Sequence, residues 1–204
     1  MANAPAVIHA PTEAAVESQT GRNAVLALWI WLSAESVFFA TLIGTYLLMH
    51  TQTNGGLSPK TAFDIPLTFI GTIILLSSSM TMALGYAQVQ RGNIGRFRAW
   101  LVLTAILGLG FLSFQAVEFT TFYHRGLTLH SSPFGSAFFT LTGFHGLHVL
   151  FGVFWLVSVL LYSFKPTFLQ EARTKVQVLG LYWHFVDVVW VVIFSLVYLL
   201  GKVG

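Results

Sequence analysis

Five long apolar runs constrain this chain more than any other feature of its sequence. A helix needs about 20 residues to cross the roughly 30 Å hydrocarbon core of a bilayer, and each run is at least that long. The runs extend from Ala24 to Met49, Ile65 to Gln88, Ala99 to His124, Ser136 to Phe164 and Val176 to Leu200. Because lipid offers no hydrogen-bond partners, continuous runs of this length predict helices rather than barrel strands. The sequence therefore predicts an all-α integral membrane bundle of five transmembrane helices.

The composition agrees with lipid as the solvent for most of the surface. Of the 204 residues, 55% are hydrophobic and 8% are charged, and the mean hydropathy is +0.76. One soluble core cannot bury that much apolar surface. The net charge of +3 is explained by basic loops beside a membrane better than by a nucleic-acid partner. The chain has no cysteine, which excludes disulfides and thiolate metal sites, so any cofactor would need His and carboxylate ligands.

The distribution of Lys and Arg predicts the orientation, because basic loops resist transfer across the membrane. Seven basic residues fall on one side of the predicted bundle: Arg22, Arg91, Arg96, Arg98, Lys165, Arg173 and Lys175. Three fall on the other side: Lys60, Arg125 and Lys202. We therefore expect a cytoplasmic N-terminus and an external C-terminus, with a cytoplasmic tail over residues 1–22 and the transmembrane domain over residues 23–204.

Small residues at helical spacing suggest which helices approach each other. One stripe lies in the first span, at Ser36, Ala40 and Gly44, and another lies in the second span, at Ser77, Thr81 and Gly85. Small side chains let two backbones come close together, which favours association where lipid removes the hydrophobic drive. The stripes favour packing of the first span against the second.

Six ionisable residues lie inside the predicted spans: Glu35, Glu118, His145, His148, His184 and Asp187. Insertion into hydrocarbon costs roughly 2.5 to 3.5 kcal/mol for a charged residue, so such groups usually face the bundle interior and find partners. Glu35, His148 and Asp187 fall near mid-depth and could meet in one buried polar layer. Two pairs share a helix face at i and i+3: His145 with His148, and His184 with Asp187.

A bound metal or haem is the main alternative for these side chains. Di-iron bundles use Glu-x-x-His motifs, and neither Glu35 nor Glu118 has a histidine three residues later. Two histidines on separate helices, His148 and His184, could ligate a haem, although their spacing does not require it. The simpler interpretation is that the histidines are hydrogen-bonded groups of the bundle core.

Several aromatic residues fall toward the ends of the spans, where amphipathic rings favour the headgroup region. They are Trp29, Trp31, Trp100, Tyr162, Tyr182 and Tyr198. We expect them to anchor the helices at the membrane interface. Trp183 and Trp190 are expected to pack rather than to hold a cofactor.

Two long motifs carry a family resemblance. Gly143 to Val149 reads GFHGLHV, and Tyr182 to Trp190 reads YWHFVDVVW. Both closely resemble signatures of subunit III of haem-copper terminal oxidases, in the compact bacterial form with five helices. The resemblance continues through GSAFF at residues 135–139, QAVEF at 115–119 and SAESVFFA at 33–40, and it covers the chain from Gly21 to Gly201.

The resemblance implies an accessory, non-redox subunit of a cytochrome c or quinol oxidase in the bacterial cytoplasmic membrane. The chain would bind no haem or copper itself, because both would lie in partner subunits of a complex that reduces oxygen to water and pumps protons. Its partners would be subunit I directly, with subunit II and a small subunit IV in the same complex. Glu35 matches the family's buried mid-membrane carboxyl.

Structural phospholipid is also expected from the resemblance. The subunit would hold lipids between groups of helices and support proton uptake. Four basic side chains are candidates for contact with lipid headgroups, which are anionic and lie at the same level: Arg98, Lys165, Arg173 and Lys175.

The predicted orientation can be tested with single cysteines, because the natural chain has none to interfere. In sealed cells, a cysteine at Lys202 should react with an impermeant thiol reagent added from outside, whereas a cysteine at Arg173 should react only after permeabilisation. The opposite pattern would contradict the assignment from basic residues.

Overall fold

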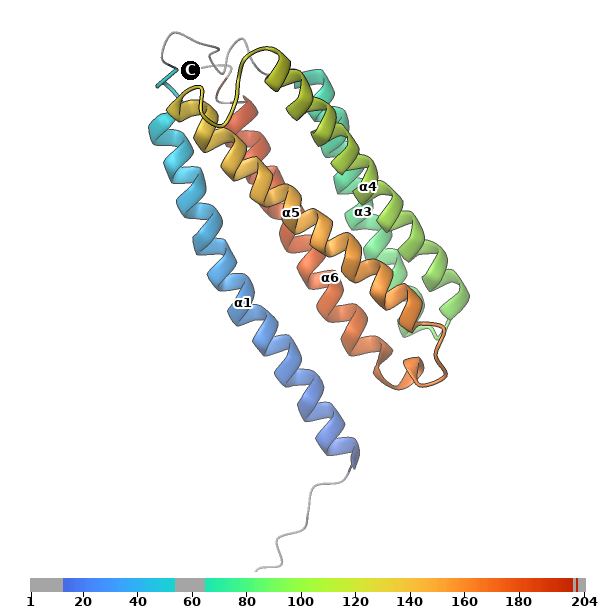
Figure 1. Ribbon diagram of the computed structural model, residues 1–204. Coiled ribbons are helices and arrows are strands. Elements are labelled where there is room, and N and C mark those ends of the chain that lie inside the picture. Colours follow the sequence, from blue (N-terminus) through green and yellow to red (C-terminus); the bar gives the residue numbers. More distant parts are fainter. Residues whose placement is uncertain (1–12, 54–64, 200, 202–204) are drawn as a thin grey trace, which may run out of the picture.

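The computed structural model describes residues 13–53, 65–199 and 201 of the chain. They form the helices α1 (Glu13–Met49), α3 (Ile65–Gln90), α4 (Ile94–His124), α5 (Pro133–Tyr162) and α6 (Phe168–Ile193), and α6 continues into a π-helical segment, η1 (Phe194–Leu199) (Figure 1). Five helices are long and apolar enough to cross a membrane. The predicted all-α membrane class is confirmed. Lys60 and Lys202 lie outside the described residues.

Four helices, α1, α4, α5 and α6, begin earlier than the apolar runs predict, and α1 and α6 do so by two turns or more. The first starts at Glu13 rather than Ala24, so helix extends into the segment expected to be a tail. The last starts at Phe168, which places Arg173 and Lys175 in its opening turns instead of a loop. Lys175 Nζ lies 2.7 Å from the Glu171 carboxylate one turn earlier. Hydropathy detects the part of a helix that lies in lipid, whereas helical hydrogen bonding continues into the polar segments at the membrane surface.

The bundle has a four-helix part and one outer helix. α3 and α4 form an antiparallel pair joined by a short turn in which Gly92 adopts a φ of +74°, a conformation that favours glycine. α5 and α6 complete the four-helix part, since α3 also packs on α6 and α4 on α5. α1 packs against α5 and α6, on the side away from α3 and α4 (Figure 1).

The expected pairing of the first two spans is therefore wrong. Two of the three small residues of α3 face α4 instead, and Ser77 is exposed: Thr81 Oγ1 lies 2.8 Å from Thr104 Oγ1, and a Cβ on Gly85 would lie 3.3 Å from the Trp100 side chain. On α1, Ala40 is exposed, and a Cβ on Gly44 would meet nothing within 4 Å. The short turn between α3 and α4 makes these two helices antiparallel neighbours, and a stripe of small residues does not identify its partner.

The indole of Trp183 fills the centre of the four-helix part. Its Nε1 donates a hydrogen bond to Ser78 Oγ of α3 at 2.9 Å. Two glycines make room for its ring: a Cβ on Gly108 of α4 would lie 2.7 Å from the indole, and a Cβ on Gly152 of α5 would lie 2.8 Å from it. Trp183 thus contacts the other three helices of the four-helix part.

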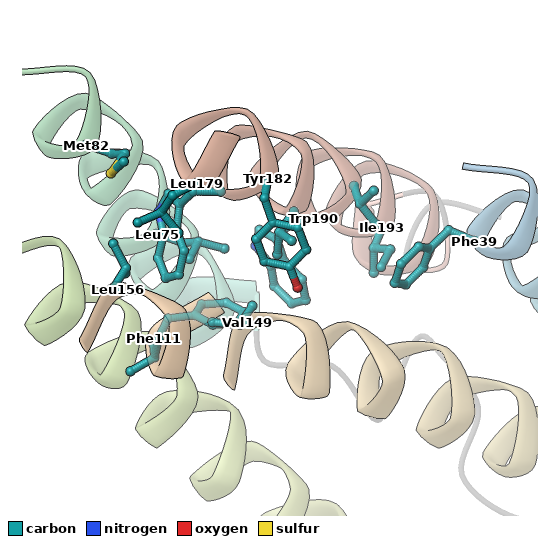
Figure 2. Packing of buried hydrophobic residues seen from close by; sticks show 14 of the residues in the cluster. Phe39, Leu75, Met82, Phe111, Val149, Leu156, Leu179, Tyr182, Trp190 and Ile193 are labelled. Atoms are coloured by element: carbon teal, nitrogen blue, oxygen red, sulfur yellow. The ribbon is translucent and has the colours of Figure 1, made fainter. Parts of the chain in front are cut away.

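A second layer of aromatic rings lies farther along α6 (Figure 2). Trp190 meets the Phe111 ring edge to face at 4.7 Å, and its Nε1 donates to Thr72 Oγ1 at 2.9 Å. The interface positions expected for Tyr182 and Tyr198 are wrong, because both side chains are fully buried and their hydroxyls donate hydrogen bonds inside the bundle. A hydroxyl with an internal acceptor does not need the headgroup region.

Replacing Gly152 with Ala should lower the free energy of unfolding by about 1 to 3 kcal/mol, because the new methyl overlaps the Trp183 ring and the core must shift. Gly143→Ala is the matched control on the same helix, since its Cβ would meet nothing within 4 Å. It should be neutral or slightly stabilising. Thermal unfolding of the detergent-extracted protein measures both. Equal midpoints for the two variants would show that Trp183 does not depend on this close approach.

Candidate functional site

Glu35 and His148 form a pair that joins α1 to α5. Glu35 Oε2 lies 3.2 Å from His148 Nε2, and the two side chains are 20% and 16% exposed. The ring of Phe39, one turn after Glu35, meets the imidazole edge to face at 5.0 Å. Tyr182 of α6 donates to the His148 carbonyl oxygen at 2.8 Å. Side chains from three helices thus hold the pair in place within the membrane.

The hydrogen-bond partners determine how the pair can hold a proton. His148 Nδ1 lies 2.7 Å from the Phe144 carbonyl oxygen, which can only accept, so Nδ1 carries a hydrogen. A hydrogen bond between Oε2 and Nε2 then needs one further proton. Either a neutral carboxyl of Glu35 donates to a neutral imidazole, or an imidazolium donates to a carboxylate. Both states have no net charge, which reduces the cost of burying the pair in lipid.

A different polar group lies between α3 and α6. Ser79 Oγ and His184 Nδ1 form a hydrogen bond at 2.6 Å. Asp187, which follows His184 by one turn, is buried, and neither of its oxygens has a hydrogen-bond partner among the described residues. The Ser79 hydroxyl lies beside the Asp187 carboxyl, although its hydrogen bond goes to His184. The structure therefore does not bring Asp187 to the Glu35 pair.

His145 lies in an apolar environment. The side chain is fully buried and stacks on the Trp190 ring at 4.9 Å, with the Phe111 ring edge to face at 5.8 Å. Neither of its nitrogens has a hydrogen-bond partner among the residues that the structure describes. The expectation of hydrogen-bonded core histidines thus holds for His148 and His184 and fails for His145.

Glu118 belongs to a third polar group, nearer the C-terminal end of α4. Thr68 Oγ1 donates to Glu118 Oε1 at 2.7 Å, and Tyr198 of η1 donates to Oε2 at 2.8 Å. Tyr46 of α1 donates to the Val197 carbonyl oxygen of the same π-helical segment at 3.3 Å. Such segments occur mostly as single wide turns within helices, often at functional sites. The hydrogen bonds of this group link α1, α3, α4 and η1.

At the basic end of the bundle, some of the positively charged side chains bind other residues of this chain. Arg98 donates from Nε to Ser163 Oγ at 2.9 Å and from Nη2 to the Ser163 carbonyl oxygen, and its guanidinium lies 4.0 Å from the centre of the Phe164 ring. It therefore caps the C-terminal end of α5, where a cation is favourable. Lys175 and Lys165 have their Nζ atoms 3.9 and 5.6 Å from the Tyr162 ring centre. Arg173 is exposed.

Sequence reasoning found the ionisable side chains and missed their hydroxyl partners. The hydroxyl partners are Ser79, which binds His184, and Thr68 and Tyr198, which both bind Glu118. Each hydroxyl lies on a different element from the ionisable group to which it is hydrogen-bonded. A buried carboxyl predicts that some donor is present, but Ser and Thr occur throughout these spans. Within the described ranges, no three His, Asp or Glu side chains are grouped closely enough to hold a metal ion.

Comparison with known proteins places these groups in context. A model of the protein family described as Cytochrome c oxidase subunit III matches residues 23–202. The chain is 39% identical to Quinol oxidase subunit 3 of Bacillus spizizenii, over 96% of this chain and 95% of the relative. It is 40% identical to Cytochrome c oxidase subunit 3 of Bacillus sp. (strain PS3), over 90% and 89%. It is also 36% identical to Cytochrome bo(3) ubiquinol oxidase subunit 3 of Pseudomonas aeruginosa, over 89% and 87%.

Proposed function

Because the chain belongs to the cytochrome c oxidase subunit III family, we propose that it is the accessory, non-redox subunit of a respiratory terminal oxidase. The match over residues 23–202 carries this proposal and confirms the resemblance inferred from the sequence motifs. Haem and copper would lie in partner subunits. This chain would bind subunit I directly and share the complex with subunit II and a small subunit IV, in the cytoplasmic membrane of a bacterium.

The same comparison bears on the electron donor. Relatives named quinol oxidase and cytochrome c oxidase subunits are 39% and 40% identical to the chain over most of its length. A subunit that contacted the donor would be expected to resemble one class more than the other. We infer that the donor is selected by other chains of the complex and that this subunit serves either type.

The Glu35 and His148 pair is proposed to fasten α1 to the rest of the bundle. α1 packs on α5 and α6 along one side, and most of its remaining surface is exposed. Besides the pair, its contacts with α6 and η1 include the Trp31 ring, stacked on Tyr182 at 5.5 Å, and the Tyr46 hydrogen bond to Val197. A paired carboxyl at mid-depth is a directional link that apolar contacts in lipid do not supply.

A groove beside the basic end supports the proposed contacts with phospholipid. It encloses about 390 Å³, and it lies between α1, the end of α5 and the start of α6. Its lining is formed by Ala24, Trp155, Ser158, Val159, Tyr162, Thr174, Lys175 and Val178. An acyl chain fits such an apolar lining, and Lys175 with Lys165 would meet the headgroup phosphate. Arg98, which caps α5, is less available for this role than Lys165, Lys175 or Arg173.

Gentle detergent extraction followed by identification of the co-purifying chains tests the assignment as an oxidase subunit. We expect this chain to be recovered with a large haem-bearing protein whose visible spectrum reports the haem. The chain itself, dissociated and repurified, should show no Soret band. Recovery as a stable monomer with no haem-bearing partner would overturn the proposal, as would a Soret band that disappears on changing His148 and His184.

Substitutions at Glu35 separate a structural link from a proton carrier. Gln can still donate a hydrogen bond to His148 Nε2, so Glu35→Gln should be mild. Glu35→Ala leaves the imidazole without its partner, at about 1 to 3 kcal/mol, and should loosen the subunit from the complex. Ser36→Ala is the matched control, because among the described residues Ser36 Oγ bonds only the Leu32 carbonyl of its own helix. Oxygen consumption, proton release and the amount of retained subunit are measured for each variant.

The two roles give different outcomes. An obligatory proton carrier would lose turnover equally in Glu35→Gln and Glu35→Ala, since neither side chain ionises. Equal loss of turnover with full retention of the subunit would therefore defeat the structural account of Glu35.

A further inference from the structure

One nitrogen of His184 lies at the surface of the bundle, near the middle of the membrane. The residue is about 13 positions, or roughly 20 Å, from the start of its span, Glu171–Leu199. His184 and Ser79 are both half-buried in the seam where α6 and α3 lie side by side (Figure 1). His184 Nδ1 is hydrogen-bonded to Ser79 Oγ at 2.6 Å. His184 Nε2 is open to the surface of the chain and has no hydrogen-bond partner among the described residues.

The hydrogen bond to Ser79 determines that Nε2 is a donor. The Ser79 hydroxyl makes no other hydrogen bond within the described ranges, and neither oxygen of the adjacent Asp187 carboxyl has a partner there. Ser79 therefore donates its proton to Nδ1, and in a neutral imidazole the other nitrogen then carries the hydrogen. His184 thus directs an N–H group out of the bundle at mid-depth.

Lipid offers no acceptor for this N–H group. The oxygen atoms of a phospholipid lie outside the hydrocarbon core, and an unsatisfied polar group inside that core is costly. Exposed hydroxyls elsewhere in the spans avoid the cost by donating to a carbonyl oxygen one turn back in their own helix, as Ser33, Thr41 and Ser113 do. His184 Nε2 has no such bond within its own helix. Its acceptor must come from another protein chain.

We propose that the seam of α3 and α6 around His184 is a docking surface for a membrane helix of another oxidase subunit, which presents an acceptor oxygen to His184 Nε2. A hydroxyl, a carboxamide or a free backbone carbonyl on that helix has the required chemistry. The inference rests on the proposed function and adds the face through which this chain joins the complex.

The side chains around His184 suit a packed helix but do not identify the surface by themselves. Leu76 lies one turn from Ser79, and Val188 lies one turn from His184; they are 39% and 61% exposed. Exposed apolar residues occur on all five spanning helices, because lipid solvates them equally well. The N–H group of His184 distinguishes this seam, since it needs a partner that lipid cannot supply.

Photo-cross-linking in the intact complex tests the surface. Benzoylphenylalanine replaces Val188 or Leu76 in turn, and the matched control carries it at Ile106, which is 57% exposed on α4. The Val188 and Leu76 positions should each form an adduct with the same membrane-spanning chain of the complex, and the Ile106 position should not react with that chain. Adducts at Val188 with lipid alone, or with a second copy of this chain, would overturn the proposal.

Substitutions separate the outward N–H group from the internal hydrogen bond. His184→Ala removes both, Ser79→Ala removes only the internal bond, and His184→Gln keeps an N–H donor near the position of Nε2. The ratio of this chain to haem, followed as the detergent-extracted complex is diluted, gives an apparent dissociation constant. His184→Ala should raise that constant about tenfold, because an acceptor on the partner loses its donor in a water-free interface. Ser79→Ala and His184→Gln should each raise it by less than about threefold.

The outcomes distinguish this inference from the proposed function. Equal loss of the subunit in Ser79→Ala and His184→Ala would show that only the internal bond matters and would contradict the docking surface. Extraction without any haem-bearing partner would overturn the proposed function and the docking surface together. Recovery with that partner, but with no Val188 adduct to another chain, would overturn the docking surface alone.

Discussion

The four-helix part of the bundle depends on the close approach of helices around Trp183. Its indole lies where α3, α4 and α5 meet α6, and it donates its one N–H to Ser78. That position exists only because Gly108 and Gly152 have no side chains. Lipid solvates apolar side chains as well as another helix does, so the hydrophobic effect does not drive helices together in a membrane. Close packing must supply the stabilisation instead. A large flat ring between two glycines provides many such contacts.

The same helix faces supply hydrogen-bond partners to polar groups that cannot reach water. Both tryptophans of α6 donate to hydroxyls on α3, at Ser78 and Thr72. Ser79, next to Ser78, bonds His184. α3 thus supplies small hydroxyl partners to α6 along about two turns. This pairing positions α3 and α6 relative to each other by direction as well as by distance, which apolar packing alone does not do.

The outer helix α1 is attached in a different way. Among the described residues, α1 makes no contact like that of Trp183, and its link at mid-depth is the pair of Glu35 with His148. A hydrogen bond between a carboxyl and an imidazole can carry no net charge, which lowers its cost in lipid. For a subunit that must join other membrane chains, a helix held along one side leaves its other side available for protein or lipid. The groove beside Lys175 lies along the same helix.

The sequence by itself determined the helical class, the number of spans and the family. Long apolar runs admit one kind of secondary structure in lipid, and the GFHGLHV and YWHFVDVVW motifs are long enough to identify relatives. It also identified the six carboxyl and imidazole side chains in the interior of the spans, because hydrocarbon makes such residues rare. Helix ends were less predictable, as Glu13 and Phe168 show, since a helix continues past the apolar segment into the polar membrane surface.

Only the tertiary structure decided which helices meet and which polar groups pair. The stripes at Gly44 and Gly85 look alike in the sequence, yet Gly85 faces Trp100 and Gly44 faces nothing within 4 Å. Likewise Glu35 pairs with His148, whereas Asp187 and His145, at similar spacing in the motifs, have no hydrogen-bond partner among the described residues. Periodicity determines the face of a helix on which a side chain lies. The rotation and neighbours of that helix come from contacts between residues far apart in the chain, which no local pattern encodes.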